Sequence, residues 1–331
     1  MNQIHSMTMA VNTNMENFAV IDLGSNSCRM TITQVQEDGS YQVTHRLKEM
    51  VRLSENEDET ATPTLHPEAI DRTIAALQSF KAVYEKLPNL TLKAVATAAT
   101  RKASNQKKFL KQVKTTVGLD IEVIPGTSEA YYDYVGVVNT LPTTNCVMMD
   151  TGGGSCELVL IVNGQAKNLI SLPIGAVSLS EKFGLNDQIS ASALFDAMTF
   201  VDKLFNSVWW LRNGLNLPLV CLGGSNRTLA KINRRKSNFL NFEDIHGYRL
   251  RDEAIYQTFN EVLAQDAAGR AKIPGLAKDR ADIIVGGMIP AIMLMRFLDS
   301  DRIIFSQNGL REGILFEHLT SLAEQSSKVP E

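Results

Sequence analysis

Cysteine is scarce in this 331-residue chain, and its placement argues against several kinds of site. The four cysteines form no C-x-x-C pair, which argues against a disulfide framework and against a zinc site. No histidine lies near any of them in the sequence, which argues against a cysteine nucleophile. We therefore expect reduced, buried thiols in a cytoplasmic protein at Cys28, Cys146, Cys156 and Cys221.

Excess positive charge and long apolar runs are missing as well. The formal net charge is −3, which argues against a nucleic acid partner. The most apolar stretch, Ile283 to Leu298, is short and contains Pro290 and Arg296, so it favours a buried helix over a membrane span. Residues 1–17 have neither a basic region nor an apolar core, and we expect a flexible leader there rather than a signal peptide.

The chain does contain alternating strand and helix patterns in both halves. Its length corresponds to about two domains of ~100–200 residues each. The alternation predicts an α/β fold with mixed sheets. We expect one domain at 18–138, a second at 139–312, and a C-terminal helix at 313–331 that packs back on the first.

The most informative stretch runs from Val147 to Ile161. An apolar run ends in Asp150, three glycines and Ser155 follow, and a second apolar run begins after Glu157. This pattern predicts a β-hairpin whose glycine turn can hold phosphate oxygens with its backbone N–H groups. The two carboxylates suit Mg²⁺, which prefers oxygen ligands and shared phosphates. The alternative is a tight hairpin with an incidental acid at each end.

A second stretch, Val20 to Ile32, repeats this pattern. The aligned pairs are Asp22 and Asp150, Gly24 and Gly152, Ser27 and Ser155, Cys28 and Cys156, and Arg29 and Glu157. Lys93 to Arg101 likewise aligns with Leu219 to Arg227 at nearly the same offset. Two matches in the same order predict a duplicated domain. The two turns would then face each other across a cleft, with an acidic wall for metal and a basic wall at Arg29 for phosphate.

Three charged segments allow two interpretations. The acidic loop 54–64 has the composition of a solvated surface loop, and the lysines of 107–114 have that of a solvated helix face. The alternative is that the basic clusters 107–114 and 234–236 extend a track for a long polyanion.

Seven motifs in this order resemble the exopolyphosphatase / guanosine pentaphosphate phosphohydrolase family. One such motif is weak, whereas seven in order are specific. They are I-D-L-G-S-N-S (Ile21–Ser27), A-T-A-A-T-R (Ala96–Arg101), G-T-S-E-A (Gly126–Ala130), D-T-G-G-G-S-C-E-L (Asp150–Leu158), L-G-G-S (Leu222–Ser225), P-G-L-A-K-D-R-A-D (Pro274–Asp282) and N-G-L-R-E-G (Asn308–Gly313).

The resemblance implies two duplicated ribonuclease H-like (actin-like) domains with an inter-domain cleft, in the short two-domain form of the family. It implies a phosphoanhydride hydrolase that releases terminal orthophosphate from inorganic polyphosphate, or the 5′-γ-phosphate of guanosine pentaphosphate. Mg²⁺, or another divalent cation, is the implied cofactor. A homodimer is the implied assembly.

The resemblance also assigns roles to residues. Glu129 matches the family's general base, Asp150 and Glu157 match its Mg²⁺-holding acids, and Asp22 lies near the same site. The implied phosphate contacts are Gly24, Ser25, Asn26, Ser27, Arg29, Arg101, Gly152, Gly153, Gly154, Ser155, Gly224 and Ser225. Judged by its position alone, Glu129 would be a first-turn acid that completes a helix cap begun at Gly126. The resemblance favours the catalytic role.

Two other functions fit a site of this kind. A sugar or small-molecule kinase of the same fold superfamily would need an acceptor pocket with an aspartate base, and we find no such motif. A non-catalytic sensor of guanosine tetraphosphate or polyphosphate would bind its ligand in the cleft without turnover.

Overall fold

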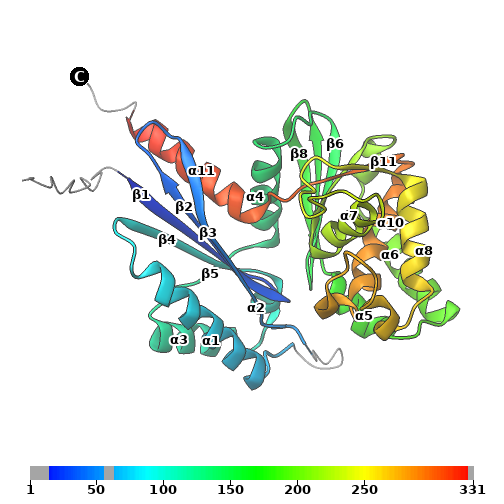
Figure 1. Cartoon of the computed structure of the whole chain (residues 1–331), viewed down its shortest axis with the longest axis horizontal. Helices are drawn as coiled ribbons and strands as arrows, with labels where there is room; N and C mark the ends of the chain where they lie inside the picture. The colour runs from blue at the N-terminus through cyan, green and yellow to red at the C-terminus, as the bar shows by residue number, and fades with distance from the viewer. Residues whose placement is uncertain (1–14, 56–62, 327–331) are drawn as a thin grey trace, which may run out of the picture.

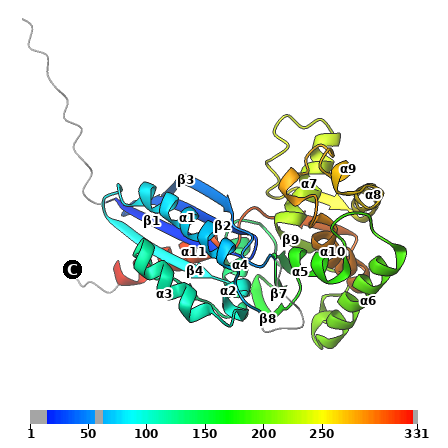
Figure 2. The ribbon, with the colours of Figure 1, turned by 90° about the horizontal axis from the view of Figure 1, so that it is seen from below.

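The computed structural model describes residues 15–55 and 63–326, which form two lobes side by side (Figures 1 and 2). Each lobe is built on one mixed β-sheet with helices packed against it. Most of the expected leader 1–17 and most of the acidic loop 54–64 lie outside the described residues.

The first sheet has the strand order β3-β2-β1-β4-β5. Strands β1 and β2 are antiparallel, as are β2 and β3, whereas β4 runs parallel to β1 and to β5. The strands are β1 (Glu16–Leu23), β2 (Ser27–Val35), β3 (Tyr41–Met50), β4 (Leu90–Ala96) and β5 (Glu122–Val123). Helices α1 (Pro67–Tyr84), α2 (Ala98–Lys102) and α3 (Gln106–Val117) belong to this lobe, and the apolar faces of α1 and α3 pack on the sheet.

The second sheet repeats this arrangement. Its order is β10-β11-β9-β6-β7-β8, so five of its strands match the first sheet in order and direction. The strands are β6 (Cys146–Thr151), β7 (Cys156–Val162), β8 (Gln165–Leu172), β9 (Leu219–Gly223), β10 (Arg249–Arg251) and β11 (Arg302–Phe305). The predicted α/β class with two duplicated mixed sheets is thereby confirmed. Only the short edge strand β10 is additional.

The helices of the second lobe surround the central helix α10. They are α5 (Ala176–Phe183), α6 (Ala191–Ser207), α7 (Gly224–Lys236), α8 (Asp252–Leu263), α9 (Ala267–Arg270) and α10 (Ile284–Leu298), with 3₁₀ turns η1 (Leu211–Gly214) and η2 (Lys278–Arg280). Residues 284–295 are all buried, which confirms the predicted core helix. Among the helices of the described ranges, none is both long and apolar enough to cross a membrane.

Two helices connect the lobes. Helix α4 (Gly126–Val138) packs through Ala130 and Val137 on the second sheet, while α11 (Leu310–Ser326) packs on the first (Figure 1). The two helices touch each other backbone to backbone, since a Cβ on Gly313 would stand 1.9 Å from the carbonyl oxygen of Tyr132. This packing holds the start of α4 between the sheets.

Helix α6 ends at Ser207, because the chain is extended at Val208 before it enters η1. After this break Trp210 is buried, whereas Trp209 is 81% exposed. All four cysteines are free and buried, as predicted.

Candidate functional site

The two glycine turns predicted from the repeat have the same backbone geometry. Gly24 N donates to Ser27 O at 3.1 Å, and Gly152 N donates to Ser155 O at 3.0 Å. Strand pairing sets Asp22 opposite Arg29 in one hairpin and Asp150 opposite Glu157 in the other. The alignment read from the sequence is therefore also a structural equivalence.

The two turns pack directly against each other. A Cβ on Gly153 would stand 2.9 Å from Cβ of Ser25, which is closer than real Cβ atoms approach. Behind it, a Cβ on Gly175 would stand 2.4 Å from the carbonyl oxygen of Gly153. Lys102 Nζ also donates to the carbonyl oxygen of Gly154 at 2.9 Å. Glycine is needed at position 153 because any side chain would push the two walls apart.

A cavity of about 110 Å³ lies between the walls, and most of the predicted site residues line it. These are Asp22, Gly24, Ser25, Asn26, Ser27, Arg29, Glu129, Asp150, Gly152, Gly153, Ser155 and Gly224. Four predicted residues do not line it, namely Arg101, Gly154, Glu157 and Ser225.

Two of these four, Arg101 and Glu157, do not line the cavity but interact with residues that do. Arg101 Nη1 donates to Glu129 at 3.2 Å and to the carbonyl oxygen of Ile124 at 2.9 Å. The Glu157 side chain is 1% exposed, and its Oε1 accepts a hydrogen bond of 2.7 Å from the Ser171 hydroxyl. Burial and the nearby charge of Asp150 raise the pKa of Glu157 to about 7. Its role in metal binding stays a prediction.

Glu129 faces the cavity from the start of α4. The helix is capped at Pro125, so Glu129 is its fourth residue, and its side chain pairs with Arg101 instead of capping the helix. The capping role considered from the sequence is therefore wrong. Burial and the charge of Glu157 raise the pKa of Glu129 well above its usual value, while Arg101 opposes that rise. A carboxylate with a raised pKa is a stronger base.

Four arginines contribute to the lining of the cavity. Arg227, Arg280 and Arg311 join Arg29 there, from α7, η2 and α11 respectively. Burial and the charges of Arg227 and Arg311 lower the pKa of Arg29 to about 9. Four guanidinium groups held together against their mutual repulsion form a site for a polyanion.

Sequence reasoning left these three arginines without a role, although all three stand in stretches it had singled out. Arg227 is the counterpart of Arg101 in the repeat, and Arg280 and Arg311 belong to the last two motifs. The glycine before Arg227 also has a packing role, because a Cβ on Gly224 would stand 2.2 Å from the Arg280 guanidinium. Asp133, a further acid on α4, was missed entirely.

A second, wider cavity of about 620 Å³ shares the four arginines with the first. Arg46, Lys48 and Lys231 add positive charge to its wall, against the acids Glu243 and Glu312. The two cavities therefore adjoin at these arginines, and the wall of the larger one carries mainly positive charge.

The predicted basic track does not contribute to either cavity. Lys107, Lys108, Lys111 and Lys114 lie exposed on α3, which agrees with a solvated helix face. Arg234 lies over the rings of Phe239 and Tyr248, Arg235 lies over Phe242, and Lys236 pairs with Glu261. These segments line neither cavity, so the polyanion track proposed for them is not supported.

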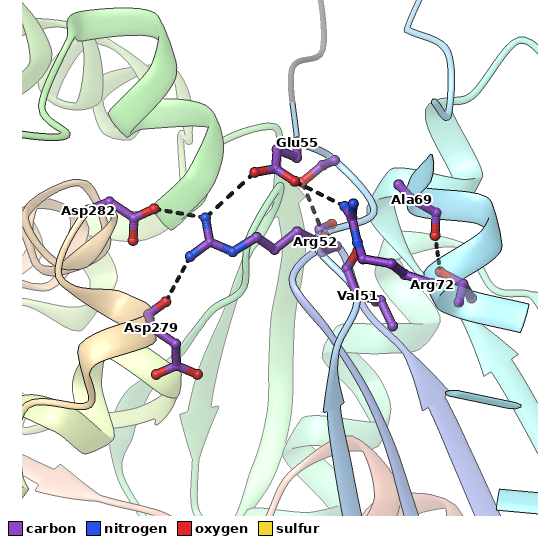
Figure 3. Close-up of polar contacts among 10 residues, drawn as sticks. Val51, Arg52, Glu55, Ala69, Arg72, Asp279 and Asp282 are labelled. Carbon is purple, nitrogen blue, oxygen red and sulfur yellow. Dashed lines mark hydrogen bonds and ion pairs between the residues drawn. The ribbon is translucent and has the colours of Figure 1, made fainter. Parts of the chain in front are cut away.

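An arginine of the first lobe bonds to residues of the second lobe (Figure 3). Arg52 Nη1 donates to Asp282 Oδ2 at 2.8 Å, and Nη2 donates to the carbonyl oxygen of Asp279 at 3.1 Å. On its own side, Glu55 lies 3.7 Å from Arg52 and 3.0 Å from Arg72. The start of loop 54–64 is therefore ordered, and Ser54 is buried rather than solvated.

We expect Arg52 and Asp282 to be energetically coupled across the cleft. In a double-mutant cycle of Arg52→Met and Asp282→Asn, urea unfolding should yield a coupling of about 1 kcal/mol, because the pair is partly exposed. Arg72→Met is the matched control, since in the part of the chain that the structure describes its guanidinium bonds to Val51 O and Glu55 of its own lobe. A coupling with Asp282 no larger than that of the control would contradict the contact.

The arrangement of the acids in the site determines which metal ion they can bind. Among residues 15–55 and 63–326, no three His, Cys, Asp or Glu side chains converge as a closed metal centre requires. However, Asp150 Oδ1 is buried without a hydrogen-bond partner. Mg²⁺ commonly takes only one or two carboxylates and completes its shell with water and substrate phosphates. The residues present therefore fit such an ion, with Asp150 as its first ligand.

Comparison with known proteins agrees with these observations. A sequence model of the Ppx/GppA phosphatase family matches residues 31–322. The chain belongs to this family. The resemblance inferred from the seven motifs is confirmed, and the Ppx/GppA match includes all or most of each motif's residues except the first, which ends at Ser27.

Curated relatives of this Ppx/GppA chain are longer than it is. A bifunctional 3-dehydroquinate synthase/phosphatase of Fusobacterium nucleatum is 30% identical over 90% of this chain and 46% of that protein. A guanosine-5'-triphosphate,3'-diphosphate pyrophosphatase of Vibrio parahaemolyticus is 29% identical over 93% of this chain and 60% of that protein. The chain thus spans 46% to 60% of the length of these relatives.

Solved structures include Ppx/GppA chains of similar extent. An Aquifex aeolicus Ppx/GppA enzyme is 31% identical with a TM-score of 0.74, over 92% of this chain and 99% of that chain. An exopolyphosphatase from Cytophaga hutchinsonii has a TM-score of 0.83 at 24% identity, over 92% of this chain and 98% of that chain, which shows the same fold.

Proposed function

We propose that this Ppx/GppA chain hydrolyses a terminal phosphoanhydride bond and releases orthophosphate. The observation that carries the proposal is the convergence of four arginines, two glycine turns and the buried carboxylate Glu129 on one cavity. Phosphoryl transfer to water needs charge neutralisation and an oriented nucleophile more than covalent help from the protein. The site supplies both.

Each group in the cavity has a role in this reaction. The backbone N–H groups of the two turns and the guanidinium groups of Arg29, Arg227 and Arg311 hold the phosphates. Glu129 accepts a proton from the attacking water, and Arg101 keeps its carboxylate in place. A divalent cation held by Asp150, with Asp22 and Glu157 as the other predicted acids, would offset phosphate charge when bound.

Inorganic polyphosphate and guanosine pentaphosphate are the two candidate substrates. The wider cavity favours a substrate that continues beyond its terminal phosphates, because its wall carries Arg46, Lys48 and Lys231. The printed names of the Vibrio relatives favour the guanosine nucleotide, and the name of the Cytophaga structure favours polyphosphate. A cytoplasmic location, a homodimer and the absence of a nucleic acid partner stay predictions from the sequence.

A side-by-side turnover assay tests the proposal. The purified chain is incubated with Mg²⁺ and either polyphosphate or guanosine pentaphosphate, and released orthophosphate is measured. We expect release from at least one substrate. No release from either, with tight binding of one of them, would replace the proposal by a sensor function. Transfer of phosphate from ATP to a sugar instead of to water would identify a kinase.

A further inference from the structure

A further buried acid of the site is Asp133. Its side chain is 1% exposed and lines the small cavity, one helical turn after Glu129 on α4. Both of its carboxylate oxygens are buried and have no hydrogen-bond partner in the described part of the chain. A buried carboxylate without a hydrogen-bond partner or an opposite charge strongly destabilises the fold. We therefore expect a bound ion or a proton to compensate for it.

Asp133 lies beside the end of strand β9. A Cβ on Gly309 would stand 2.7 Å both from Asp133 Oδ1 and from Cδ2 of Leu222. Leu222 is in turn the parallel strand partner of Asp150. Glycine at position 309 thus leaves open the space beside the Asp133 carboxylate, close to the strand end that carries Asp150.

Asp150 and Asp133 differ in their charged surroundings. Arg227 and Arg29 act on Asp150 and offset part of its charge. Burial raises the pKa of Asp133 well above its usual value, and the nearby carboxylates, of which Asp150 is the strongest, raise it further. Arginines therefore offset part of the charge of Asp150, whereas the charged groups that act most strongly on Asp133 are carboxylates.

We propose that Asp133 and Asp150 together hold the divalent cation of this site. Helix α4 then supplies one of the metal ligands, Asp133. Three carboxylate oxygens support this, namely both of Asp133 and Oδ1 of Asp150, because all are buried and lack a partner. Glu157, by contrast, does not line the cavity and accepts a hydrogen bond from Ser171. Two carboxylates with phosphate and water in the remaining positions suit Mg²⁺. The choice of this cation rests on the proposed function.

The alternative occupant is a proton. A protonated Asp133 is neutral and needs no cation. A buried acid can stay protonated in this way, through a raised pKa, instead of pairing with a cation. The two possibilities differ in what asparagine does at this position. Asparagine keeps the shape, carries no charge, and binds a divalent cation more weakly than a carboxylate.

Mn²⁺ alone is the probe, with no substrate present. Its binding to the full chain is measured by isothermal titration calorimetry and by the EPR signal of free Mn²⁺, for wild type, Asp133→Asn, Asp150→Asn and the control Asp196→Asn, an exposed acid on α6. We expect Asp133→Asn and Asp150→Asn each to weaken Mn²⁺ binding at least ~10-fold, a loss seen even for groups that only support metal ligands. Asp196→Asn should bind Mn²⁺ as wild type does.

Thermal unfolding supplies an independent readout. In EDTA, Asp133→Asn should melt a few degrees above wild type, because it removes an unpaired buried charge. With Mn²⁺, wild type should gain stability and the variant should gain little. If asparagine at position 133 affected only the fold, it would shift the melting temperature equally in EDTA and with Mn²⁺.

Three results would overturn the inference. They are an unchanged Mn²⁺ affinity of Asp133→Asn, no Mn²⁺ binding by wild type, and equal melting shifts with and without metal. The outcome is separable from that of the proposed function. A chain that binds Mn²⁺ through Asp133 but releases no orthophosphate refutes only the function, whereas turnover with Asp133-independent Mn²⁺ binding refutes only the cation site.

Discussion

Replacing Glu129 by glutamine is expected to lower kcat for phosphate release by roughly 10²–10⁴-fold, with little change in KM. Glutamine keeps the size of the side chain and its contact with Arg101, but it cannot accept a proton from water. The loss therefore appears in the chemical step. Steady-state kinetics on the better of the two substrates measures it.

The pH dependence gives a second test of Glu129. The carboxylate must be ionised to act as a base, and burial together with Glu157 raises its pKa well above the usual value. We therefore expect kcat/KM to rise with pH through this raised pKa. Arg101→Gln removes the cation that opposes the rise, so the acid limb of the profile should move to still higher pH.

Glu122→Gln is the matched control for these experiments. Glu122 is an exposed acid on β5 that pairs with Lys93, and it lines neither cavity. Its kinetics and pH profile should match wild type. A Glu129→Gln variant with wild-type kcat, or an Arg101→Gln profile that does not move, would exclude Glu129 as the base.

Arg29→Gln is expected to lower kcat/KM by roughly 10–150-fold, the range for removing a hydrogen bond to a charged group. Arg29 lines both cavities and pairs with Asp22 across the first hairpin. We therefore expect its guanidinium to contact a phosphate that the first turn holds. The change is measured as kcat/KM over a series of substrate concentrations.

The same variant should unfold at a higher temperature than wild type when no phosphate is present. Burial and the charges of Arg227 and Arg311 oppose the positive charge of Arg29, so its removal relieves a repulsion. Lower activity with higher stability is typical of a residue kept for binding rather than for folding. Differential scanning calorimetry in phosphate-free buffer measures the shift.

Arg46→Gln is the control for Arg29, because Arg46 is exposed on β3 and lines the wider cavity but not the small one. It should leave the melting temperature unchanged and should alter kcat/KM less than Arg29→Gln does. Equal losses of kcat/KM in Arg29→Gln and Arg46→Gln would mean that both arginines act only through general electrostatic attraction of the substrate. A lower melting temperature for Arg29→Gln would mean that Arg29 stabilises the fold.

Local patterns in the chain were sufficient to predict the two hairpins. An apolar run, a glycine turn and a second apolar run determine where each strand stops and how the turn folds, since only a few residues are involved. The repeat of this pattern predicted the duplicated sheets and the facing walls. Asp22, Asp150 and both glycine turns were found in this way, and they line the cavity as expected.

The groups that complete the site come from distant parts of the chain. Arg280 and Arg311 reach the cavity from η2 and α11, and their local sequences resemble those of ordinary solvated helix ends. Asp133 likewise resembles a surface acid on α4, yet it is buried because α4 packs on the second sheet and against α11. None of these burials could be read from nearby residues.

The sequence by itself therefore determined the two glycine turns, their duplication and the family, because short-range backbone geometry and the order of motifs are local properties. Tertiary structure alone decided which charges meet at the site. The packing of α4 and α11 between the sheets brings Asp133 and Arg311 into the lining of one cavity, and Asp133 is buried there. Charge–charge interactions strengthen when water is excluded, so the chemistry of the site depends on packing that no local pattern contains.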